Sequence, residues 1–122
     1  MSVRDNEMTA RQTSWLLPWL AWIVLVASPA ATAADDLEMT IVIKDHRFSP
    51  TELKVPAGRK IKLIVDNQDA TPEEFESHSL NREKVIAARS KGTIFIGPLK
   101  PGKYPFVGEF HEATAKGVVI AE

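Results

Sequence analysis

Histidines close to carboxylates are the residues of this sequence whose types could support chemistry. The chain has three histidines, at positions 46, 78 and 111, and the last of them lies between Glu109 and Glu112 in a short polar loop. No cysteine is present, so the chain cannot supply a thiolate. Imidazole nitrogens and carboxylate oxygens suit Fe(II), Fe(III), Cu(II) or Mn(II), whereas Cu(I) prefers soft sulfur donors. These residue types therefore favour a site for one of the harder metal ions.

Hydrolytic chemistry is a weak interpretation of the same residues. His78 lies between Ser77 and Ser79 in a segment that is expected to be extended. Successive side chains of a strand point to opposite faces, so His78 is separated from both serines and cannot activate either of them. No glycine-rich phosphate loop is present. The sequence therefore gives no support to a hydrolase or a nucleotide-binding enzyme.

Short alternating segments must position the histidines and carboxylates. These segments are rich in β-branched residues, and none has a convincing helical period. Proline and glycine turns, such as those at residues 56–58 and 98–102, separate them. The sequence therefore predicts one all-β sandwich of seven or eight strands. The expected strands cover residues 38–44, 51–55, 59–65, 73–80, 83–88, 93–96, 103–107 and 117–121.

The first 33 residues have the features of an export signal. An apolar run over residues 15–27 follows two arginines and precedes the small residues Ala31-Thr32-Ala33. The run is short for a membrane span. We therefore expect a signal peptide over residues 1–33, cleaved near Ala33 or Ala34, and a periplasmic domain over residues 34–122. An uncleaved anchor helix is the alternative.

The expected mature domain is nearly neutral. All but two of the 15 basic residues and all but two of the 16 acidic residues follow the leader. Nucleic acids and anionic membranes select proteins with a clear basic excess. We therefore expect no nucleic-acid partner, and membrane contact only through another protein. Without cysteine the domain has no disulfide, so a bound metal ion would add to the stability of a small apolar core.

The end of the chain resembles the cupredoxins. Residues 104–111 have the pattern Tyr-x-Phe-x-Gly followed by a histidine, and the family has Tyr-x-Phe-x-Cys followed by histidine and methionine. Gly108 stands in place of the cysteine, Ala115 in place of the methionine, and Glu73 in place of the first histidine. The resemblance implies a Greek-key cupredoxin-like sandwich. A blue copper site needs the copper–thiolate bond, so the missing cysteine excludes blue-copper electron transfer.

Two longer segments, residues 67–78 and 108–112, are more similar to the cupredoxin-like module of the EfeO type, which serves bacterial periplasmic ferrous-iron uptake. This resemblance implies a metal-binding protein that is an accessory to iron (or copper) acquisition, holding an iron or copper ion. Its expected partner is an iron permease or another periplasmic subunit. Ferroxidase-type oxidation of Fe(II) stays open, since one small domain has no evident electron store. A metal-free interaction module on such a partner is the alternative function.

The resemblance also implies which residues form the site, because three loops meet at one end of a cupredoxin sandwich. If Phe75 packs in the core, alternation places Glu73 on the same face at the rim and turns Glu74 outward. His78 would lie roughly 16 Å along the strand from Glu73 and is not expected to bind. Met39 is expected to pack in the core. The expected metal ligands are His46, Glu73, Glu74, Glu109 and His111.

Overall fold

The computed structural model describes residues 27–28 and 36–122. The expected signal peptide and its cleavage site therefore lie outside the described residues, apart from two isolated positions of the leader. Residues 36–122 form nine strands and one short 3-10 helix, η1 (Glu109–His111). Within the described residues, no helix is long and apolar enough to cross a bilayer.

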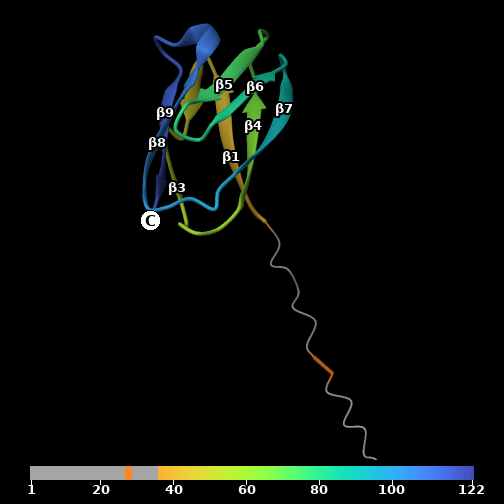
Figure 1. Cartoon of the computed structure of the whole chain (residues 1–122). Coiled ribbons are helices and arrows are strands. Elements are labelled where there is room, and N and C mark those ends of the chain that lie inside the picture. Colours follow the sequence, from red (N-terminus) through yellow and green to blue (C-terminus); the bar gives the residue numbers. More distant parts are fainter. Residues whose placement is uncertain (1–26, 29–35) are drawn as a thin grey trace, which may run out of the picture. The chain divides into compact units, whose positions relative to one another are not determined.

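The strands form two sheets that enclose the core (Figure 1). In spatial order, the first sheet contains β2 (Arg47–Ser49), β1 (Leu37–Lys44), β4 (Ile61–Asn67) and β7 (Ser90–Ile96). The second contains β3 (Glu52–Val55), β9 (Lys116–Ala121), β8 (Gly102–Gly108), β5 (Glu73–Ser77) and β6 (Arg82–Ile86). β1 pairs with β4 in parallel, as β3 does with β9, and the other pairs are antiparallel. The all-β sandwich expected from the sequence is confirmed.

The strand that sequence reasoning missed is β2, which brings the count to nine. It has three residues and forms a hairpin with β1, in which Lys44 pairs with Arg47. The two residues between the strands, Asp45 and His46, have φ angles of 50° and 55°. Positive φ at both central residues is the feature of a type I′ turn, whose twist suits a tight hairpin. This turn fixes the backbone that carries His46.

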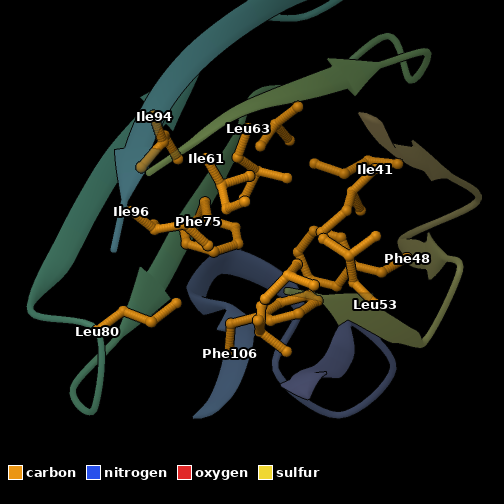
Figure 2. Close-up of a cluster of buried hydrophobic side chains, with 14 of the residues drawn as sticks. Ile41, Phe48, Leu53, Ile61, Leu63, Phe75, Leu80, Ile94, Ile96 and Phe106 are labelled. Atoms are coloured by element: carbon orange, nitrogen blue, oxygen red, sulfur yellow. The ribbon is translucent and has the colours of Figure 1, made fainter. Parts of the chain in front are cut away.

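Alternation along the strands builds the core. In β4, every second residue from Ile61 to Asn67 is buried, and the series ends on the polar Asn67. Figure 2 shows Phe48, Phe75 and Phe106 among the aliphatic side chains of both sheets. The ring centroids of Phe75 and Phe106 lie 5.1 Å apart, and those of Phe48 and Phe106 lie 4.9 Å apart in an edge-to-face contact. Met39, as expected, packs against this core.

One end of the sandwich gathers the β1–β2 turn, the β4–β5 loop and the β8–β9 loop with η1. The chain ends at the opposite end of the domain (Figure 1). The Gln68 N–H donates to the Ile43 carbonyl at 2.9 Å and thus joins the β4–β5 loop to β1. The Gly108 N–H donates to the Ala115 carbonyl at 2.9 Å and closes the β8–β9 loop. The Thr114 hydroxyl also donates to the His46 carbonyl at 2.7 Å. The three loops are therefore fixed to one another.

Candidate metal centre

Three of the five expected ligands, His46, Glu73 and His111, come together at this end. Each offers one ligand atom, and these atoms all lie within 4.8 Å of one another. The residues come from the β1–β2 turn, the start of β5 and the end of η1. Two imidazoles and a carboxylate at these separations match the donor set of a borderline transition-metal ion. We call this set the inner group.

Glu73 is the buried member of the inner group. As alternation predicted, it shares the face of Phe75, but it is 1% exposed and does not sit at the rim. The reason is η1, which covers it: the Phe110 N–H donates to Glu73 Oε1 at 2.9 Å. The Glu74 N–H donates to the same oxygen at 3.0 Å, and His111 Nδ1 lies 2.6 Å from Glu73 Oε2. Two backbone N–H groups therefore donate to Oε1, and the His111 imidazole lies within hydrogen-bonding distance of Oε2.

Gly108 leaves the room that the Glu73 carboxylate occupies. A Cβ atom added at Gly108 would lie 2.7 Å from Glu73 Cδ, 2.9 Å from Glu73 Oε1 and 2.7 Å from the Cβ of Ala115. Real Cβ atoms essentially never approach other atoms to less than 3.0 Å. Gly108 and Ala115 stand where the resemblance places cysteine and methionine. A buried carboxylate therefore fills the space beside Gly108 that a larger side chain there would need.

The two imidazoles of the inner group lie against each other. The ring centroids of His46 and His111 are 3.5 Å apart, and the ring planes are inclined by 13°. The side chains are 41% and 30% exposed, so both rings reach solvent while Glu73 does not. The imidazoles therefore form the solvent-exposed side of the group, and the Glu73 carboxylate forms its buried side. Because the lone pair of an imidazole nitrogen lies in the ring plane, one of the two stacked rings must turn before both can bind the same ion.

Asp69, which sequence reasoning did not single out, contacts His46. Its Oδ1 accepts the Asp45 N–H at 2.8 Å, and its Oδ2 accepts the His46 N–H at 3.0 Å. Burial raises the pKa of Asp69, but these two hydrogen bonds and the nearby His46 and His111 outweigh it, so the pKa lies below its ordinary value. The signal that could have found Asp69 is its place in a turn-forming loop, where aspartate commonly accepts backbone N–H groups.

The other two expected ligands, Glu74 and Glu109, lie in a different group together with Glu83, which sequence reasoning did not identify. One carboxylate oxygen from each lies within 4.8 Å of the others. Glu74 was expected to face solvent, but it is buried, with 8% of its surface exposed. The cause is the β5–β6 hairpin, which places Glu83 opposite Glu76, two residues from Glu74. We call Glu74, Glu83 and Glu109 the outer group.

Neighbouring carboxylates raise the pKa values of Glu74 and Glu76. The pKa of Glu74 rises to about 7, first because of a hydrogen bond with Glu83, then because of burial and the charges of Glu109 and Glu83. The pKa of Glu76 is also raised, mainly by a hydrogen bond with Glu109 and by burial. The structure thus separates the neighbouring residues Glu73 and Glu74 into two chemically different environments.

The remaining candidates join neither group. The His78 side chain is 96% exposed, and its nearest carboxylate is that of Glu76 at 3.4 Å from Nε2. Glu112 is exposed and lines a shallow surface hollow with Glu109, Glu76 and His78. The position of His78 agrees with the distance argument made from the sequence.

Comparisons with known proteins agree with this fold. A family model described as a cupredoxin-like domain matches residues 16–121. A protein of Rickettsia prowazekii (strain Madrid E), RP394, is 46% identical over 101 residues, which cover 83% of this chain and 81% of that protein.

Solved structures with the same fold include proteins that carry copper. Auracyanin A, a blue copper protein from Chloroflexus aurantiacus, matches with a TM-score of 0.62 and 13% identity over 71% of this chain and 99% of its own. The metal-binding domain of the Cu(I)-exporting ATPase CopA of Streptococcus pneumoniae D39 matches with a TM-score of 0.59 and 13% identity over 70% of this chain and 84% of its own. At such identities these structures show the fold alone. The match of the family model over residues 16–121 places this chain in the cupredoxin-like family.

Proposed function

We propose that this protein binds one iron or copper ion through His46, Glu73 and His111 and serves metal acquisition in the periplasm. The observation that carries the proposal is the convergence of the three side chains. They come from three separate segments, and their ligand atoms lie within 4.8 Å of one another at the end of the sandwich where the loops meet. Such a set rarely assembles without a use when one carboxylate is buried, because burying a charge has a large cost in free energy.

The choice of ion follows from the donor atoms. Two nitrogens and a hard oxygen suit Cu(II), Fe(II) and Fe(III) better than Cu(I). The chain contains no cysteine, and Met39, its only methionine within residues 36–122, packs against the core. The 2.6 Å separation of His111 Nδ1 and Glu73 Oε2 is shorter than adjacent ligands of one ion require, given metal–ligand bonds of about 2.0–2.2 Å. An ion that binds both atoms would therefore replace the proton between them and widen this gap.

The proposed place of the protein is beside an iron permease or another periplasmic subunit. The segments that resemble the EfeO-type module, residues 67–78 and 108–112, include Asp69, Glu73 and His111. The features of an export signal in the first 33 residues agree with a periplasmic location. The half-exposed imidazoles would let an ion enter and leave, as transfer to a partner requires. Fe(II) oxidation is an extension of this role that needs an electron acceptor in the partner.

The alternative is a metal-free interaction module. It is favoured by the hydrogen bond between Glu73 and His111 and by the complete pairing of buried side-chain polar atoms within the described residues. A module without metal would be expected to balance its buried carboxylate with lysine or arginine. The ion pair of Glu73 is instead with a histidine, whereas Lys60 and Lys62 pair with Asp36 and Glu38. Histidine pairing leaves a metal ion able to compete.

Metal analysis of the protein isolated from the periplasm tests the proposal. We expect about one iron or copper ion per chain after isolation, or after anaerobic titration with Fe(II) and aerobic titration with Cu(II). The Cu(II) form should lack the intense blue colour of a copper–thiolate site. Failure to bind either ion at micromolar concentration would favour the interaction module. An intense blue colour would show that a cysteine from another protein completes the site.

A further inference from the structure

We propose that Asp69 is a positioning residue of this site, which holds the β1–β2 turn and keeps the proton of neutral His46 on Nδ1, so that Nε2 is free to bind the ion. The inference rests on the proposed function, because it takes His46 to be a ligand. It concerns a residue outside the inner group, and it can fail while metal binding by the other residues stands.

The carboxylate of Asp69 supports a turn whose backbone conformation is unfavourable for most residues other than glycine. Asp45 and His46 have φ angles of 50° and 55°, a region that few residues other than glycine adopt. Asp69 Oδ1 accepts the Asp45 N–H at 2.8 Å, and Oδ2 accepts the His46 N–H at 3.0 Å. One carboxylate thus binds both residues of the turn. These two hydrogen bonds fix the direction in which the His46 side chain leaves the backbone.

Asp69 is itself fixed to the body of the sandwich. Its N–H donates to the Asn67 Oδ1 at 3.1 Å, and its carbonyl accepts the Arg89 N–H at 3.0 Å. Asn67 is fully buried, and its Nδ2 donates to the Thr71 carbonyl at 2.9 Å and to the Ile86 carbonyl at 3.3 Å. Asp69 is therefore hydrogen-bonded, through its backbone N–H, to a buried polar residue at the end of a core strand.

The same carboxylate oxygen faces the His46 ring. Oδ2 lies 3.4 Å from Nδ1, which is longer than a typical N–H···O hydrogen bond of about 2.9 Å but close enough to orient the ring electrostatically. An ionised carboxylate only accepts, so the nitrogen that faces it is favoured to carry the proton. Neutral imidazole has one N–H, and Nε2 then keeps its lone pair. Carboxylates act in this way on histidine ligands in many metal sites.

The tautomer of His46 in the metal-free protein provides a first test that needs no substitution. Nitrogen-15 NMR of the imidazoles at a pH of about 8, where an ordinary imidazole is neutral, distinguishes Nδ1–H from Nε2–H. We expect the Nδ1–H form to predominate at His46. A predominant Nε2–H form would overturn the proposal whatever the metal affinity.

Asp69→Asn tests the same idea by substitution, with Asp66→Asn as the matched control. The amide is uncharged and has one acceptor oxygen in place of two, so it loses one of the two hydrogen bonds to the turn as well as the charge beside the His46 ring. We therefore expect the Nε2–H tautomer to increase and metal affinity to fall by about 10-fold to 100-fold. Asp66 contacts Gln68 Nε2 at 3.3 Å, and its replacement should change affinity by less than about threefold. Unchanged affinity and tautomer in a folded Asp69→Asn protein would contradict the proposal.

His46→Ala separates the failure of this inference from the failure of the proposed function. We expect it to weaken metal binding and to make a further Asp69→Asn change nearly silent, because the two residues act through one ligand. If His46→Ala leaves affinity unchanged while His111→Ala abolishes binding, Asp69 has no positioning role and metal binding stands. If the unaltered protein binds neither Fe(II) nor Cu(II), the proposed function fails, and positioning for a metal fails with it.

Discussion

The inner group and the outer group differ although they share a strand, and Glu73 and Glu74 are neighbours in sequence. Glu73 points into the sandwich, where N–H groups and an imidazole surround its oxygens. Glu74 points to the other face, where its closest titratable neighbours are Glu83 and Glu109. Two backbone N–H groups donate to the inner carboxylate, whereas the outer carboxylate lies among other carboxylates, which with burial raise its pKa to about 7. Side-chain direction on one strand thus decides whether a buried glutamate suits a metal ion or a proton.

The largest expected effect contrasts the two neighbouring glutamates. Glu73→Gln should weaken metal binding by about 10-fold or more, because a ligand contributes at least as much as a residue that only supports a ligand. His111→Ala should do the same. Glu74→Gln, the matched change on the opposite face, should alter affinity by less than about threefold. Isothermal titration with Cu(II) or Fe(II) measures all three. A larger loss for Glu74→Gln than for Glu73→Gln would move the metal site to the outer group.

The fit of Glu73 beside Gly108 predicts the next effect. Gly108 has an ordinary extended φ of −91°, so Gly108→Ala acts through crowding and not through backbone strain. A Cβ atom there meets Glu73 and Ala115, and overpacking of this kind costs about 1–3 kcal/mol in the free energy of unfolding. Metal affinity should fall as well, because the carboxylate must move. Urea denaturation and metal titration provide the two measurements.

Gly58→Ala is the control for this substitution. Gly58 has a φ of +74°, and a Cβ atom there would have nothing within 4 Å. Alanine in this conformation costs about 1–2 kcal/mol through the backbone alone. Gly58→Ala should therefore lower stability with no change in metal affinity. If Gly108→Ala behaves in the same way, Gly108 has no role in seating Glu73.

A smaller effect is expected on the pH dependence of stability. The pKa of Glu74 in the folded chain is raised to about 7, above its value in the unfolded chain, so the folded state binds more protons between a pH of about 4.5 and 7. Stability of the metal-free protein should therefore decrease as pH rises through this range, and Glu74→Gln should flatten the decrease. Thermal melts in the presence of a chelator measure it. An increase of stability over this range that Glu74→Gln leaves unaltered would contradict the assignment.

The smallest effect is expected at His78. Its side chain is 96% exposed and belongs to neither group, so His78→Ala should leave metal affinity within about a factor of three. It is the natural control for His111→Ala, since both remove one imidazole. Loss of binding in His78→Ala with normal binding in His111→Ala would show that the site lies at the other end of β5, near His78.

The sequence was sufficient to predict the all-β sandwich and the inward direction of Glu73, because both follow from alternation within a strand. It could not predict that Glu74 is buried or that Glu83 lies beside it, because both depend on the register of the β5–β6 hairpin. It also missed β2, since three residues are too few to show a period. Asp69 went unnoticed because its contacts with the β1–β2 turn join residues more than 20 positions apart.

The parallel pairing of β1 with β4 and of β3 with β9 has a consequence for the order of folding and metal binding. Parallel neighbours cannot be joined by a tight hairpin, so these pairings form only after long loops close, which makes such topologies slow to fold. Glu73 and His111 are separated by 38 positions and meet only when η1 lies against β5. A metal ion would therefore bind only after the sandwich has folded. It would stabilise the folded state and slow its unfolding, without nucleating its formation. Refolding rates should be insensitive to added metal, whereas unfolding rates should fall with it.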